Sequence, residues 1–180
     1  MSFFNVKPGS VIETHHFIHD MKIMSDSAQC LYRYFCNISD EKYHLPHFNH
    51  FDIISILNFT IAEHVWLLKK IDNDYKINVC GSGIEYIFNK TFHQKYLRDI
   101  LKQEDYYIMD SFFDQLIKEK IGTLNTGLIY DTNLRILNGE KIIIPIIDRD
   151  SYCFFGCFIQ NKMTISSEKN SGKFYFNFQS

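Results

Sequence analysis

The chain has 180 residues, of which 46% are hydrophobic and 16% aromatic, and its formal net charge is −2 at pH 7. Acidic and basic residues are mixed along it, so it lacks the basic field that nucleic-acid binding requires. Its longest apolar runs fall short of the ~20 residues that span a bilayer, and residues 1–13 lack the apolar core of a signal peptide. We therefore expect a cytoplasmic protein with no membrane span and no nucleic-acid partner.

Composition shifts along the chain predict one domain between two less regular ends. Residues 1–24 form an arm without a clear hydrophobic period, and residues 161–180 form a tail that is polar until its aromatic end. Between them, residues 25–160 are long enough to bury a core without a disulfide or a metal. The five cysteines are odd in number and include no CxxC pair, so we expect reduced thiols.

The first predicted element is an amphipathic helix of about three turns. Asp26 and Gln29, three positions apart, form an expected capping box at its start. The apolar residues that follow at helical spacing are Ala28, Leu31, Phe35 and Ile38.

A hairpin is predicted next. Residues 61–71 are rich in β-branched and aromatic side chains, and Asn73 and Asp74 supply a turn. The second strand follows, because Tyr75, Ile77 and Val79 alternate with polar residues.

Helices are predicted between the hairpin and the remaining strands. Ser82 and Glu85 form a second expected capping box for a short helix that ends near Phe88, and a further helical turn covers residues 96–101. The clearest helix covers residues 104–120 and has one apolar face. That face consists of Met109, Phe112, Phe113, Leu116 and Ile117.

Three more strands are predicted over residues 124–130, 139–148 and 152–160, separated by Asp- and Asn-containing turns. Pro145 lies in the second of them, which indicates an edge or a bulge at that position. Strands at both ends with helices between them are typical of an α+β fold with an antiparallel sheet covered on one face by helices.

The order of these elements and several short motifs resemble a short PAS-domain family that is common in alphaproteobacteria. The resemblance covers residues 31–160 and is carried by Leu31-Tyr32-Arg33-Tyr34, Phe48-x3-Asp52-Ile53-x2-Ile56-Leu57, Trp66-Leu67-Leu68, the segment from Tyr75 to Ser82 and the segment from Phe88 to Leu97. It implies a five-stranded antiparallel sheet with helices on one face and a small cavity between them, with an extra N-terminal helix. It also implies the strand order 2-1-5-4-3, with residues 61–71 beside residues 152–160.

The resemblance implies a non-enzymatic sensory or signalling module. Its partners would be a second copy of the chain or a signalling protein such as a kinase or a cyclase, with a small apolar ligand in the cavity. The residues expected to line that cavity are Trp66, Ile77, Tyr86, Phe112, Leu116, Tyr130 and Phe155. The residues expected at a partner or dimer interface are Leu31, Phe35 and Ile38.

Two other functions remain open. The chain could be a protein-interaction adaptor whose core is filled by its own aromatic side chains, or a small α+β enzyme that uses His64 or a carboxylate in the cavity. No cofactor is assigned. The His44-x2-His47-x2-His50 spacing has no cysteine nearby, so we expect solvated histidines there and no metal site.

Overall fold

The computed structural model describes residues 24–40, 44–57, 62–132, 135–160 and 172–178; the side chains of residues 57, 128–132, 135–138, 160 and 172 are outside this description. The helices are α1 (Asp26–Asn37), η2 (Phe48–His50), α2 (Ile53–Leu57), η3 (Ala62–His64), α3 (Ser82–Phe88), α4 (Leu97–Ile100) and α5 (Gln103–Glu119). The strands are β1 (Ser39–Asp40), β2 (Leu45–Pro46), β3 (Val65–Ile71), β4 (Asp74–Cys80), β5 (Ile121–Thr132), β6 (Arg135–Asp148), β7 (Ser151–Gln160) and β8 (Gly172–Asn177).

The fold is α+β, with an antiparallel sheet of six strands in the order β4-β3-β7-β6-β5-β8. The predicted position of β3 between β4 and β7 is confirmed by both ladders. Leu67 and Leu68 explain it, because adjacent strand residues point to opposite faces and these two belong to different cores. A strand that is apolar on both faces needs a neighbour on each side and a cover on each face.

The sixth strand, β8, corrects the expected five-stranded sheet. It pairs with β5 from Ile121↔Asn177 to Thr126↔Gly172, so part of the expected polar tail is an edge strand. Its side chains alternate: Tyr175 belongs to one core and Phe176 to the other.

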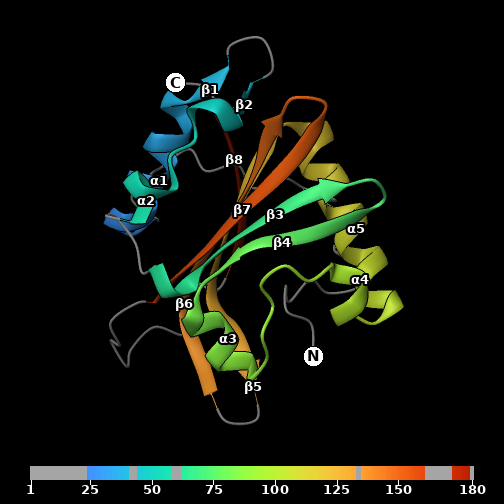
Figure 1. Ribbon diagram of the computed structural model, residues 1–180. Helices are drawn as coiled ribbons and strands as arrows, with labels where there is room; N and C mark the ends of the chain where they lie inside the picture. The colour runs from blue at the N-terminus through green and yellow to red at the C-terminus, as the bar shows by residue number, and fades with distance from the viewer. Residues whose placement is uncertain (1–23, 41–43, 58–61, 133–134, 161–171, 179–180) are drawn as a thin grey trace.

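Helices cover both faces of the sheet, not one as expected (Figure 1). Helices α3, α4 and α5 cover one face, which we call the α5 face. Helices α1 and α2 cover the other, which we call the α1 face. The sheet is therefore the middle layer of three.

The extra helix α1 packs on its own sheet. Leu31 and Phe35 are fully buried, and the Phe35 ring lies 5.3 Å from the ring of Phe155 in β7. The predicted capping box is wrong: the cap is Ser25, whose Oγ accepts from the Ala28 N–H. The backbone N–H and the hydroxyl of Ser25 both donate to the buried carboxylate of Glu140 in β6, the former at 2.8 Å.

The other expected boundaries differ in detail. Strand β3 begins at Val65 after the turn of η3, and Ser82 is the first residue of α3, with no side-chain cap. Glu85 instead accepts from the N–H groups of Phe92 and His93. Pro145 lies beyond the β5–β6 ladder, which ends at Thr123↔Ile143, so the expectation of a local edge at the proline is confirmed.

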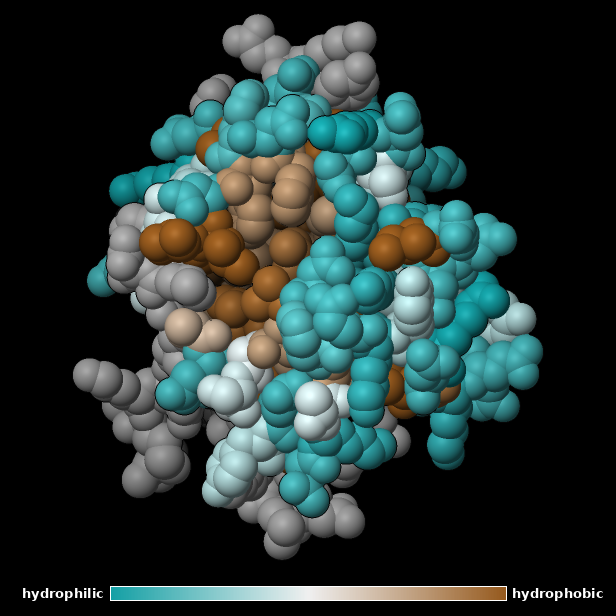
Figure 2. Space-filling model, in the orientation of Figure 1, coloured by the Kyte–Doolittle hydropathy of each residue, from teal (hydrophilic) through white to brown (hydrophobic). Residues whose placement is uncertain are grey.

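The α1 face carries an apolar surface. Figure 2 shows it as a tan and brown hollow between α1 and α2 on one side and the β3–β4 hairpin on the other. Ile54 of α2 is 71% exposed, and partly buried apolar side chains of this core include Ile38, Phe48, Phe51 and Val79. No helix among the described residues has the length and apolar character of a membrane span.

Candidate functional site

Four of the seven residues predicted to line a cavity lie together on the α5 face. Trp66 and Ile77 come from the hairpin, Phe112 and Leu116 come from α5, and all four are buried in one core. The Trp66 ring covers Gly156 of β7 so closely that a Cβ on this glycine would lie 2.0 Å from ring atoms. The absence of a side chain at position 156 therefore makes room for the indole.

The other three predicted residues do not join them. Tyr86 is 66% exposed on α3. Phe155 faces α1, whereas its neighbour Phe154 points toward α5. The side chain of Tyr130 lies outside the described part of the chain.

Three aromatic rings that were not predicted as site residues pack between α5 and the hairpin. Phe113 and Phe154 stack with centroids 4.1 Å apart, and Tyr75 meets both rings edge-on at 5.0 and 5.8 Å. Tyr75 shares its face of β4 with Ile77, which is the signal that could have found it. These rings pack against one another beneath α5.

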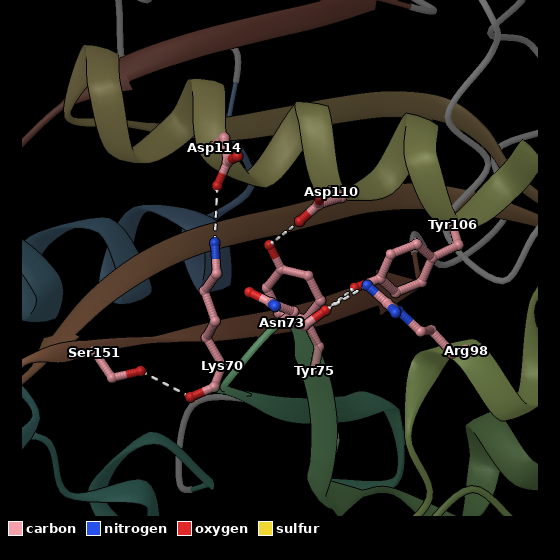
Figure 3. Close-up of polar contacts among 8 residues, drawn as sticks. All are labelled: Lys70, Asn73, Tyr75, Arg98, Tyr106, Asp110, Asp114 and Ser151. Carbon is pink, nitrogen blue, oxygen red and sulfur yellow. Dashed lines mark hydrogen bonds and ion pairs between the residues drawn. The ribbon is translucent and has the colours of Figure 1, made fainter. Parts of the chain in front are cut away.

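The hydroxyl of Tyr75, at the edge of this stack, makes a hydrogen bond with α5. It donates to Oδ1 of Asp110 in α5 at 2.7 Å (Figure 3). Burial, followed by this contact with the carboxylate, raises the pKa of Tyr75. The phenol therefore stays protonated and remains a donor at neutral pH.

A second contact attaches α5 to the hairpin one helical turn further on. Nζ of Lys70 lies 3.0 Å from Oδ1 of Asp114, and Figure 3 shows it beside the Tyr75–Asp110 pair. The Asp114 side chain is 59% exposed, so this ion pair is weak. The backbone carbonyl of Lys70 also accepts from the hydroxyl of Ser151 at 2.7 Å.

The hairpin turn is the third point of attachment. The carbonyl oxygen of Asn73 accepts from Arg98 of α4 at 2.7 Å and from the hydroxyl of Tyr106 of α5 at 2.8 Å. The Arg98 guanidinium lies 4.7 Å from the centroid of the Tyr106 ring, a cation–π distance. We call these contacts of Lys70, Asn73 and Tyr75 with α4 and α5 the hairpin latch.

A small pocket opens beside the hairpin latch, at the junction of α4 and α5. Its volume is about 240 Å³, below the ~300 Å³ at which ordinary small-molecule sites begin. The residues that line it are Arg98, Leu101, Gln103, Tyr106 and Tyr107.

Two of the predicted histidines lie in different environments. Nδ1 of His64 is buried without a described hydrogen-bond partner, and burial lowers the pKa of its ring. Nδ1 of His47 accepts from the N–H of Asn49. In the described part of the chain, no three His, Cys, Asp or Glu side chains meet as metal ligands would.

The predicted interface residues are divided between core and surface. Leu31 and Phe35 belong to the core of their own chain, so a partner could reach them only by displacing α1. Ile38, the C-cap of α1, is partly exposed.

No protein-family model matches this chain, and neither a curated protein nor a solved structure matches it.

Proposed function

We propose that this chain is a non-enzymatic PAS-type signalling module that binds a small molecule and passes the bound state to a protein partner. The observation that carries the proposal is the connectivity of the sheet. A hairpin is followed by the helical segment α3–α5 and then by β5, β6 and β7, with β3 between β4 and β7. In this arrangement the helices and the sheet can enclose a ligand.

The hairpin latch would couple ligand binding under α5 to the surface of the protein. Helix α5 touches the sheet through apolar side chains and touches the hairpin through Asp110 and Asp114. A ligand beneath α5 that favoured another position of the helix would break these polar contacts. The state of the ligand would then be coupled to the exposed hairpin turn.

Native mass spectrometry of the full chain, purified without added ligand, tests this proposal. A mass increment of one small molecule per chain, lost after denaturation, is the expected result. A chain that carries no molecule and gains none from a metabolite extract would contradict ligand sensing.

A second candidate function is a protein-interaction adaptor without a ligand. The stacked rings of Tyr75, Phe113 and Phe154 favour it, because they fill the space under α5 with the chain's own side chains. For this function we propose a second copy of the chain as the partner, seated on the apolar surface of the α1 face.

The Ile54→Asp variant tests the adaptor. Ile54 is 71% exposed, so a charge there should leave the fold intact and remove an apolar contact. We expect light scattering to show a dimer for the wild type and a monomer for the variant. Tyr107→Asp, at an exposed aromatic residue on the other face, is the matched control and should behave as the wild type. A wild type that is monomeric at all concentrations would exclude the second copy as partner.

A further inference from the structure

The pocket at the junction of α4 and α5 brings an arginine together with two aromatic rings. Its volume is about 240 Å³, and its described lining consists of Arg98, Leu101, Gln103, Tyr106 and Tyr107. Arg98 and Leu101 come from α4 and its C-cap, whereas the other three lie in the first turns of α5. Tyr106 is buried, and Arg98, Gln103 and Tyr107 are exposed, so the pocket opens at the surface.

The guanidinium of Arg98 is held in place by its own chain. One of its N–H groups donates to the carbonyl oxygen of Asn73 at 2.7 Å, and its central carbon lies 4.7 Å from the centroid of the Tyr106 ring (Figure 3). A side chain fixed in this way loses less freedom on binding than a mobile one. A guanidinium has five N–H donors, so these contacts leave donors for a ligand.

Tyr107 offers a second donor. Nε2 of Gln103 donates to the hydroxyl oxygen of Tyr107 at 3.3 Å. The hydroxyl accepts in this bond, so its own proton remains to be donated. The Tyr107 ring packs edge-on against the ring of Tyr106, with centroids 6.1 Å apart, and so adds aromatic surface beside the polar groups.

The charge of the described lining favours an anion. Arg98 is the one lining side chain in this set that is ionised at neutral pH. Asp99 and Glu104 are close to lining residues in the sequence, but neither belongs to the described lining. Arginine pairs with a carboxylate through two parallel N–H···O bonds, which are stronger and more specific than a single contact.

We propose that this pocket binds a small aromatic carboxylate. The guanidinium of Arg98 holds the carboxylate, the hydroxyl of Tyr107 donates to one of its oxygens, and Leu101 and the two tyrosine rings surround the aromatic body. Ordinary small-molecule sites begin at ~300 Å³, so the smaller pocket fits a ligand with one ring. The pocket is distinct from the space beneath α5, and it can be occupied whether or not the chain senses a ligand there.

Titration of the nitrogen-15-labelled full chain with benzoate, followed by NMR at pH 7, tests this site. We expect the backbone amide signals of residues 98–107 to shift. Benzoate should bind about five- to tenfold more tightly than benzamide, which has the ring without the charge. Acetate, which has the charge without the ring, should bind about tenfold more weakly than benzoate. The tripeptide Gly-Gly-Phe presents ring and carboxylate at a chain end, and it should bind no more tightly than benzoate.

Two variants of Arg98 separate its charge from its shape. Arg98→Gln removes the charge and Arg98→Lys removes the bidentate fork, and each should weaken benzoate binding about fivefold or more. Tyr107→Ala removes a donor and a ring and should weaken binding several-fold. Tyr107 lies outside the hairpin latch, so its variant keeps the test valid if Arg98→Gln disturbs the hairpin turn.

Lys102→Gln and Lys118→Met are the controls. Both lysines are exposed, one beside the pocket in the sequence and the other further along α5, and both variants should bind benzoate as the wild type does. The site would be overturned by benzamide or acetate binding as tightly as benzoate, by signal changes that leave out residues 98–107, or by wild-type affinity in Arg98→Gln. An equal loss in Lys102→Gln would show a general attraction of charge instead, and tighter binding of the tripeptide would make a chain end the ligand in place of a small molecule.

Discussion

Tyr75 brings a hydroxyl into a layer of aromatic rings, and Asp110 accepts its hydrogen bond at 2.7 Å. We expect Tyr75→Phe to keep the ring stack and to lower the free energy of unfolding by about 1–2 kcal/mol, because a buried hydrogen bond is lost and Asp110 loses a partner. Urea denaturation measures this change. Tyr107→Phe is the control. Tyr107 is 57% exposed, so loss of its hydroxyl should lower the free energy of unfolding by less than about 0.5 kcal/mol. Equal costs for the two variants would contradict the role given to Tyr75.

The lowered pKa of the buried Lys141 predicts how the free energy of unfolding depends on pH. Its pKa is about 7 in the folded chain, against a usual value of 10.5, so the unfolded chain binds more protons between these limits. The free energy of unfolding therefore rises as the pH increases from about 7 to 10.5. This gain in stability is lost again as the pH falls through 7. Compared with Lys141→Met, the wild type should gain up to about 1.4 kcal/mol per pH unit.

Urea denaturation of both proteins at pH 7, 8 and 9 checks this prediction. Contributions from the thiols and tyrosines are common to both proteins and cancel in the difference. Lys118→Met should run parallel to the wild type. Parallel curves for wild type and Lys141→Met would show that Lys141 keeps an ordinary pKa in the folded chain.

At the scale of elements, the start of α1 is fixed by a contact distant in sequence. Ser25 caps the helix and donates twice to Glu140, whereas Asp26 is exposed. We expect Ser25→Ala to lower the free energy of unfolding by about 1–2 kcal/mol, since it removes a cap and leaves a buried carboxylate with one donor fewer. Asp26→Ala should cost less, and thermal denaturation compares the two. A larger loss in Asp26→Ala would instead support the capping box expected from the sequence.

Elements with a strong hydrophobic period could be predicted from the sequence, whereas their ends could not. The apolar face of α5 and the alternation of β4 specify their own structure, because the pattern lies within each element. The cap of α1 depends on Glu140, a residue 115 positions away, and no local pattern contains it. Strand β8 was missed because it has only six residues, its aromatic residues are consecutive and show no period of two, and it follows a long polar stretch.

At the scale of the whole molecule, α1 packs as part of the fold, with Leu31 and Phe35 in the core. Leu31→Asp with Phe35→Asp would place two charges in the core between α1 and the sheet, which is costly. We expect this double variant to lose cooperative unfolding in circular dichroism, whereas Ile54→Asp should remain folded. A folded, monomeric double variant beside a dimeric wild type would show that α1 can leave the sheet and would support its predicted role as an interface.

The candidate site could be predicted only in part for a related reason. Trp66, Ile77, Phe112 and Leu116 share one core, because each lies on a face that its own element defines. The parity of β7 could not be chosen, since Phe154 and Phe155 are both large and both faces of the sheet are buried. The residues of β5 that face β8 could not be identified, because β8 had not been assigned as a strand.

The packing of α1 against late strands has a consequence during protein synthesis. Ser25 meets Glu140, and the ring of Tyr32 lies 5.3 Å from that of Phe176, near the end of the chain. A ribosome adds ~5–20 residues per second, so Ser25 leaves the exit tunnel roughly 6–23 s before Glu140, which lies 115 residues further along the chain. During that interval Leu31 and Phe35 have no sheet to cover, so this apolar stripe is exposed on the nascent chain.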